Sequence, residues 1–65
     1  LPLDMLFLTS SGDIDSIAEN TTPFPLETIS SEHPVRMVLE IPGGTSKRLN
    51  IKPGDHIAHI ASKYL

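Results

Sequence analysis

Among the acidic side chains, Asp4 has the position that most strongly suggests a chemical role. It interrupts an apolar stretch that runs from Leu3 to Leu8, and burying an unpaired carboxylate among apolar residues is very costly. Asp4 is therefore expected to accept hydrogen bonds from the backbone of a neighbouring loop, which we favour, or to line a pocket that binds a ligand. We retain four candidate ligand-binding residues: Asp4, Asn20, Phe24 and Glu40.

Two pairs of residues have side chains that could bind a metal ion. Asp13 and Asp15 flank Ile14 on one face of a predicted strand, and paired carboxylates suit a hard cation such as calcium. Solvated turn charges are the simpler interpretation. His56 and His59 are three positions apart, so they would share one face of a helix but lie on opposite faces of a strand. We expect no native metal site, and at most adventitious binding at these two histidines.

A glycine-rich segment, Gly43-Gly44-Thr45, precedes a predicted short helix and could offer backbone N–H groups to an anion. It lacks the lysine and the spacing of a phosphate-binding loop. An ordinary cap between a strand and a helix explains the same residues, and we favour that interpretation.

The serines of the chain show no arrangement with a base that would make one of them a nucleophile. None of Ser10, Ser11, Ser30, Ser31, Ser46 and Ser62 has a positional tie to a base. His33 follows Glu32 directly, but adjacency in sequence is not the geometry of a catalytic triad. A small hydrolase is therefore the least favoured hypothesis, and we expect neither enzymatic activity nor a cofactor.

The composition indicates a small protein that depends on association. The chain has 65 residues, a net charge of −3 and no cysteine, and this length allows one domain. A core of this size seldom supplies more than about 3–5 kcal/mol, so such folds depend on disulfides, metals or oligomerisation. No apolar run approaches the roughly 20 residues that cross a bilayer, and no signal segment is visible.

The first part of the chain predicts a hairpin. Residues 3–8 are apolar, and the polar cluster after them, with Gly12 able to take a positive φ, is typical of a hairpin loop. Residues 14–20 return as a second strand. Ile14 and Ile17 are three apart and would face opposite sides of a flat strand, so we expect either a β-bulge or an irregular edge strand.

The middle of the chain predicts a long connection followed by the clearest strand. Residues 21–34 contain three prolines, which confine this segment to loops or sheet edges. Residues 35–41 alternate apolar and other side chains with a period of two, which indicates a strand with one buried face.

The last part of the chain predicts one short helix and leaves the C-terminus ambiguous. Residues 45–49 suit a short helix, Asn50 suits a left-handed stop, and Lys52-Pro53-Gly54-Asp55 is the signature of a type II turn. The turn and the β-branched Ile57 favour a strand over 55–60. The apolar spacing of residues 57–65 is that of a helix, so strand and helix both remain open for the tail.

Three stretches together resemble the domain of unknown function 192 family: PLDMLFL, then GDI, then PVRMVLEIPGGTSKRLNIKPGD. The resemblance covers roughly residues 2–58. The matching positions are Pro2, Leu3, Asp4, Gly12, Ile14, Glu19, Asn20, Val38, Leu39, Glu40, Gly44, Thr45, Arg48, Leu49, Ile51, Lys52, Gly54 and Asp55.

The resemblance implies a compact, mostly β fold with a barrel-like sheet and short helices. Family domains are about twice as long, and a tryptophan-containing strand precedes the P-L-D motif in them. Residues 1–65 would thus form a single small β-rich domain equivalent to the C-terminal half of the family domain. The edges of strands 3–8 and 35–41 would then be open to pairing. We expect a two-fold dimer or a tetramer, joined through apolar sheet edges, that completes a small antiparallel or mixed sheet.

The leading hypothesis for function is a non-enzymatic, oligomeric binding module with an unknown small-molecule or protein ligand. Its binding groove would lie between subunits, near Asp4, Asn20 and the loop 22–34. The resemblance implies no established activity; it makes export possible, and a cytoplasmic location is equally compatible. The alternative is a DNA-binding dimer, because RLNIKPGDHI resembles the turn and strand entry of swapped-hairpin transcription factors. The acidic balance disfavours nucleic acid, since basic residues cluster only over residues 47–52.

Overall fold

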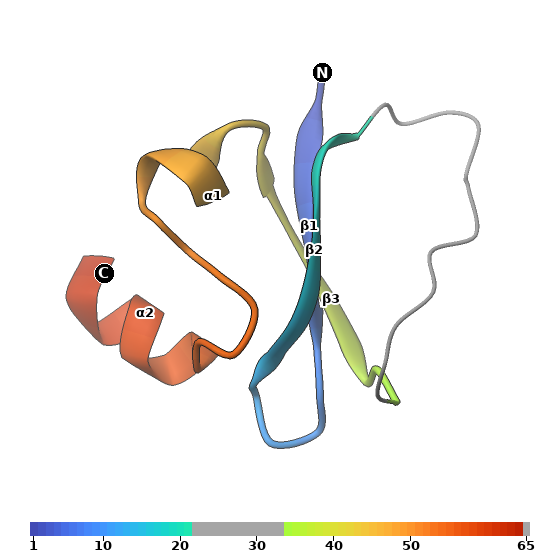
Figure 1. Ribbon diagram of the computed structural model, residues 1–65, viewed down its shortest axis with the longest axis vertical. Coiled ribbons are helices and arrows are strands. Elements are labelled where there is room, and N and C mark those ends of the chain that lie inside the picture. The colour runs from blue at the N-terminus through green and yellow to red at the C-terminus, as the bar shows by residue number, and fades with distance from the viewer. Residues whose placement is uncertain (22–33, 65) are drawn as a thin grey trace.

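The computed structural model describes residues 1–21 and 34–64, which form one antiparallel sheet and two short helices. The elements in chain order are β1 (Leu3–Leu8), β2 (Ile14–Thr21), β3 (Met37–Pro42), α1 (Thr45–Arg48) and α2 (Ile57–Tyr64). The strand order is β2-β1-β3, with β1 antiparallel to both neighbours. Both helices lie against the same face of the sheet (Figure 1). The mostly β fold is confirmed, and the described sheet is open, with three strands.

The strand β2 contains the irregularity that the spacing of its isoleucines predicts. Leu6 is opposite Ile17 and Leu8 is opposite Ile14, and the register shifts between Phe7 and Leu8. The extra residue in β2 returns both isoleucines to the face that carries Leu6 and Leu8. Both expected explanations therefore apply, because β2 is an edge strand and carries the bulge.

The loop between β1 and β2 needs a glycine at its tightest point. The N–H of Gly12 donates to the carbonyl of Thr9 over 2.9 Å, and Gly12 has a φ of +85°. A Cβ at this position would lie 3.3 Å from both the ring of His56 and a methyl group of Ile57. Conformation and close packing against the start of α2 thus both favour glycine here.

The core lies between the sheet and the two helices. Its buried members are Leu6, Leu8, Ile14 and Ile51, and the partly buried residues packed against them are Ile17, Ile41, Leu49, Ile57 and Ile60. The sheet supplies one side of this cluster, and the segments around α1 and α2 supply the other.

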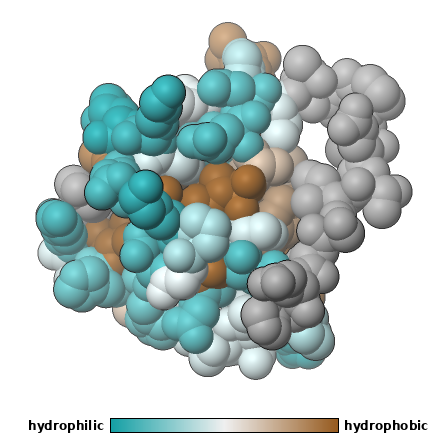
Figure 2. All heavy atoms as spheres, viewed as in Figure 1, coloured by the Kyte–Doolittle hydropathy of each residue, from teal (hydrophilic) through white to brown (hydrophobic). Residues whose placement is uncertain are grey.

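The strand β3 departs from the expectation that one of its faces is buried. The side chains of Met37 and Leu39 are 61% and 38% exposed, although they lie on the same face as the buried Leu8 and Leu6. Two short helices form too narrow a layer to cover all three strands, and only Ile41 of β3 packs against the core. On the opposite side of the sheet, which β2 borders and which faces the viewer in Figure 2, hydrophobic atoms also reach the surface in the middle of the view, beside α1.

The C-terminal residues form a helix, so the expected strand over 55–60 is wrong, and the described chain has two helices where one was expected. The predicted turn is present: Gly54 has a φ of +94°, and the N–H of Asp55 donates to the carbonyl of Lys52 over 3.0 Å. After it, the chain makes only an isolated bridge between Asp13 and His56 before α2 begins. Helical spacing then places Ile57 and Ile60 against the core. Neither described helix has the length and apolar character required to cross a membrane.

Candidate functional site

The carboxylate of Asp4 is the best-built polar centre of the fold. It is completely buried and accepts three hydrogen bonds from backbone N–H groups. Its Oδ1 accepts from Asn20 at 2.9 Å and from Gly44 at 3.2 Å, and its Oδ2 accepts from Ser46 at 2.8 Å. We call Asp4 and these three donors the Asp4 clamp. It joins β1 to the end of β2 and to the start of α1.

The hydrogen bonds of the Asp4 clamp keep the carboxylate ionised. Burial by itself raises the pKa of Asp4, but the backbone donors of Asn20, Ser46 and Gly44, helped by the Ser46 side chain, lower it to about 2. A carboxylate that accepts several backbone N–H bonds is stabilised in its charged form. Asp4 therefore carries a full negative charge at neutral pH.

The donors that the glycine-rich segment could offer to an anion are directed at Asp4. The N–H groups of Gly44 and Ser46 both donate to its carboxylate. The start of α1 thus binds an anion that belongs to the chain itself, and the favoured sequence interpretation of a strand-to-helix connection agrees with this geometry.

The neighbouring Gly43 lies where the chain leaves no room for a side chain. Its N–H donates to the carbonyl of Pro2 over 3.0 Å. A Cβ on Gly43 would lie 2.6 Å from the Oδ1 of Asn20 and 3.0 Å from that same carbonyl oxygen. Asn20 itself has a φ of +50°, a conformation that asparagine tolerates better than most residues.

The structure brings together most of the residues that the sequence singles out. Asp4, Asn20, Gly43, Gly44 and Thr45 meet at one end of the sheet, where Asn20 is exposed and Asp4 is buried beneath it. Glu40 is not part of this group: it is exposed, and its partner Met5 directs it to the face of the sheet opposite Asp4. Phe24 and most of the loop 22–34 lie outside the described residues.

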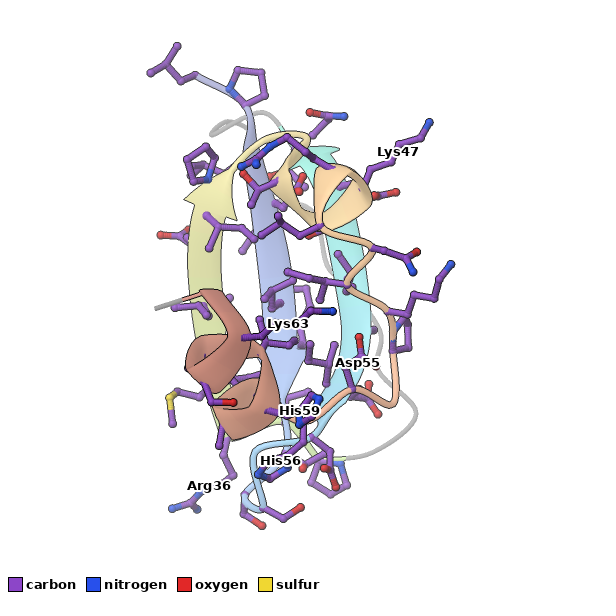
Figure 3. The ribbon with its side chains drawn as sticks, turned by 90° about the vertical axis from the view of Figure 1, so that its left-hand side faces the viewer. Arg36, Lys47, Asp55, His56, His59 and Lys63 are labelled. Atoms are coloured by element: carbon purple, nitrogen blue, oxygen red, sulfur yellow. The ribbon has the colours of Figure 1, made fainter. Side chains whose placement is uncertain are left out.

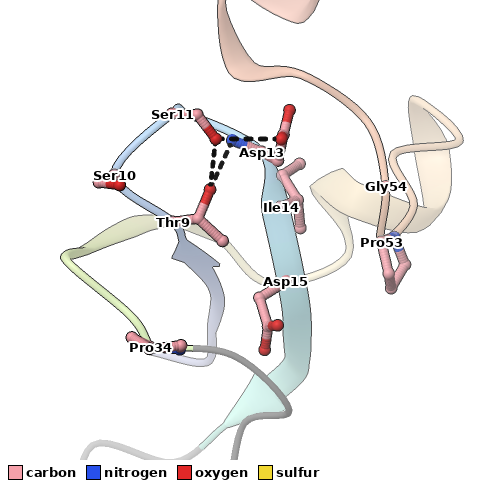
Figure 4. Close-up of a pocket in the computed structure, with 9 residues that line it drawn as sticks. All are labelled: Thr9, Ser10, Ser11, Asp13, Ile14, Asp15, Pro34, Pro53 and Gly54. Atoms are coloured by element: carbon pink, nitrogen blue, oxygen red, sulfur yellow. Dashed lines mark hydrogen bonds between the residues drawn. The ribbon is translucent and has the colours of Figure 1, made fainter.

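A second polar cluster lies at the other end of the sheet. The hydroxyl groups of Thr9 and Ser11 share a hydrogen bond of 3.0 Å, and the Ser11 hydroxyl donates to Oδ2 of Asp13 over 3.1 Å. The Oδ1 of Asp13 lies 2.9 Å from Nδ1 of His56. Hydrogen bonds from His56 and Ser11 lower the pKa of Asp13. Thr9, Ser11 and Asp13 line an open depression of about 610 Å³ (Figure 4).

This second cluster is not a catalytic triad. The carboxylate of Asp13 stands between Ser11 and His56, so the serine hydroxyl bonds to the acid and not to the base that would activate it. Within the described part of the chain, no three His, Asp or Glu side chains are grouped to hold a metal ion. Sequence reasoning missed the pairing of Asp13 with His56, because no local pattern links residues so far apart.

The two basic residues outside the cluster at 47–52, Arg36 and Lys63, do not extend it. Figure 3 shows Lys47 at one end of the sheet and Arg36 at the other, with Lys63 between them. The segment that resembles a swapped-hairpin strand entry leads into α2 instead of a strand. The strand entry on which the DNA-binding alternative depended is therefore not formed, because a helix follows the turn.

The outer edge of β3 is the most exposed apolar feature of the described sheet. Met37, Val38 and Leu39 are consecutive and are 61%, 44% and 38% exposed. Because the strand order is β2-β1-β3, β3 pairs only with β1 among the described strands. We call the side of Met37–Pro42 that faces away from β1 the β3 edge.

Comparison with known proteins gives one family match. The model of the family DUF192, described as "Uncharacterized ACR", matches residues 1–59. No curated protein and no solved structure matches the chain.

Proposed function

We propose that this chain, which belongs to the DUF192 family of uncharacterised proteins, acts as a non-enzymatic interaction module that binds an extended strand of a protein partner along the β3 edge. The observation that carries this proposal is the row of exposed apolar side chains, Met37, Val38 and Leu39, on an edge with no strand partner in the described sheet. Unpaired edges are templates for strand addition.

The alternation of β3 suits strand recognition. Met37 and Leu39 are directed to the helix side of the sheet, whereas Val38 is directed to the other side. An added strand would gain main-chain hydrogen bonds, and its side chains would contact apolar surface on both faces. Addition of a strand would also extend the open sheet, so association is the step that would complete the fold.

The Asp4 clamp has a positioning role in this proposal. It attaches α1 to the sheet near the end of β3, since Gly44 and Ser46 follow β3 almost directly. A ligand groove near Asp4 and Asn20 would use the exposed Asn20 as its contact, because Asp4 is fully buried. We propose the β3 edge as the principal surface because its apolar exposure is much larger.

A titration with short peptides tests the proposal. The isotope-labelled chain would be titrated with a synthetic eight-residue peptide of alternating valine and threonine, and amide shifts would be followed by NMR. We expect shifts at Val38 and Glu40, and a matched peptide with proline at alternate positions should produce none, because it lacks the donors. Shifts confined to Asn20 and Gly44, or none on β3 at millimolar peptide, would contradict the proposal.

A further inference from the structure

We propose that the strand bound at the β3 edge is β3 of a second copy of this chain, which runs antiparallel with the two-fold axis at Val38. This inference rests on the proposed function and names its partner. It is carried by the direction of the free backbone groups, by the apolar residues on the edge and by the two charges that flank them.

The backbone groups directed outward belong to Val38 and Glu40. The pairing of β1 with β3 runs without a register shift from Leu3 opposite Pro42 to Leu8 opposite Met37. The N–H of Gly43 donates to Pro2 across the same ladder. Since hydrogen-bonded and non-hydrogen-bonded pairs alternate in an antiparallel ladder, the residues bonded to β1 are Ile41, Leu39 and Met37.

The position of Pro42 agrees with this direction. By the same alternation, its nitrogen belongs to the outer side of β3. Proline has no N–H to offer, and prolines in sheets lie where the missing donor faces away from the neighbouring strand. Within residues 1–21 and 34–64, the donors directed away from β1 along the β3 edge are thus the N–H groups of Val38 and Glu40.

With the two-fold axis at Val38, favourable pairs of side chains stand opposite each other across the two β3 strands. Val38 stands opposite its own counterpart in a hydrogen-bonded pair, and Met37 stands opposite Leu39 of the second copy. Arg36 precedes β3, and its N–H donates to Leu8 of its own chain. Its side chain, and not its N–H, would therefore pair with Glu40 of the second copy, and symmetry repeats this pair. Opposite charges directly across a ladder are favourable, and apolar pairs bury the exposed surface.

Neighbouring registers match less well. An axis at Leu39 places Val38 opposite Glu40 and leaves Arg36 opposite Pro42, without a carboxylate. An axis at Glu40 places two carboxylates opposite each other, and like charges across a ladder are unfavourable. The axis at Val38 is the one of these three registers that pairs both charges.

Pairing of the two β3 strands would also cover the part of the sheet's helix-bearing face that the helices leave exposed. In an antiparallel pair, residues directly opposite each other lie on the same face of the sheet. Met37 and Leu39 of both copies would therefore meet beside the helix layers that leave them exposed in one copy. The N–H of Arg36 already donates to Leu8 over 2.8 Å and is not available to the second copy. At each end of the paired β3 strands, the contacts are therefore the N–H of Glu40 and the side-chain charges of Arg36 and Glu40.

Charge reversal tests the register. Arg36 and Glu40 are both exposed, so reversing either charge should leave the fold intact. In sedimentation equilibrium, Arg36→Glu and Glu40→Arg should each weaken the dimer about tenfold or more, because each places like charges together twice. The double variant Arg36→Glu/Glu40→Arg should restore dimerisation to near its original strength. Glu19→Arg, on the far edge strand β2, is the matched control and should change nothing.

Three results would overturn the inference. A dimer that is insensitive to both single reversals must use another surface. A chain that is monomeric at every concentration does not pair with itself; if the valine–threonine peptide still shifts Val38 and Glu40, the interaction module stands with a different partner. A monomer whose Val38 and Glu40 amides resist hydrogen exchange has its edge covered by its own residues, and the proposed function then fails as well.

Discussion

The Asp4 carboxylate shows how one acidic residue can organise a small fold. Three backbone donors from two distant segments converge on it, and their combined effect outweighs the cost of burial and lowers its pKa to about 2. The interruption of an apolar strand by an acid made Asp4 conspicuous in the sequence. Its partners could not be identified there, because Asn20 and Ser46 approach it only after the chain has folded.

Replacement of Asp4 by asparagine should destabilise the protein strongly. The amide cannot accept from all three N–H groups, and it introduces a donor among donors. We expect a loss of about 2–4 kcal/mol in the free energy of unfolding, because buried hydrogen bonds to a charge are lost and donors are left unpaired. Urea denaturation measures this loss, and Glu19→Gln is the control on an exposed carboxylate outside the β3 edge. A change similar to that of the control would show that the clamp does not stabilise the fold.

The pH dependence of the free energy of unfolding should report the ionisation of the Asp4 carboxylate. The pKa of Asp4 falls from 3.8 to about 2 on folding, so its contribution is complete above pH 3.8 and is lost as the pH falls toward 2. The difference in unfolding free energy between the natural chain and Asp4→Asn should therefore shrink by roughly 2 kcal/mol across this window. A difference that stays constant from pH 5 to pH 2 would contradict the assigned charge.

The close packing around Gly43, at the same end of the sheet, predicts that a larger residue at this position would destabilise the fold. A Cβ there would lie 3.0 Å from the backbone carbonyl oxygen of Pro2 and would also force the Asn20 side chain to move, so Gly43→Ala should cost about 1–3 kcal/mol, as overpacking does. Gly54→Ala is a useful comparison, because Gly54 has a positive φ but nothing within 4 Å of its added Cβ, and it should lose only about 1 kcal/mol. Thermal unfolding of both variants checks the order. Equal losses would mean that the close approach at Gly43 is unimportant.

The elements differ in how far the sequence could predict them. The strand over 3–8, the bulge in β2, the short helix and the turn at 52–55 all follow from local rules of spacing and turn chemistry. The C-terminal segment carried two conflicting local signals, a turn suited to a strand and apolar residues at helical spacing. The core decided between them, because only a helix places Ile57 and Ile60 together on it. No local rule reports where such a core will lie.

Helix α2 should therefore depend on Ile60 for its docking. Ile60 packs against the core, whereas the neighbouring His59 is exposed. Ile60→Ala should cost about 1–2 kcal/mol, less than for a fully buried isoleucine, and His59→Ala should cost almost nothing. Denaturation of both variants measures this difference, and backbone chemical shifts over 57–64 would report the helix directly. Strand-like shifts over 57–60 would contradict the fold.

The molecule as a whole is an open sheet that is well covered on β1 and poorly covered on β3. The expectation of an oligomer came from the short length of the chain and from the resemblance to a longer family domain. The structure adds the position of the exposed surface, which the alternating pattern of 35–41 concealed: that pattern predicts a buried face, and in this chain the helices do not reach it. The barrel-like closure expected from the family stays a prediction, to be reached by association.

Amide hydrogen exchange of Val38 and Glu40 as a function of protein concentration tests the central claim most directly. In the part of the chain that the structure describes, these two N–H groups are directed away from β1, and the amides bonded to β1 serve as internal references. Strand pairing at the edge predicts that exchange at Val38 and Glu40 slows as the concentration rises, with Leu39 and Ile41 unchanged. Fast exchange at both positions, at every concentration and in the presence of the valine–threonine peptide, would contradict the account.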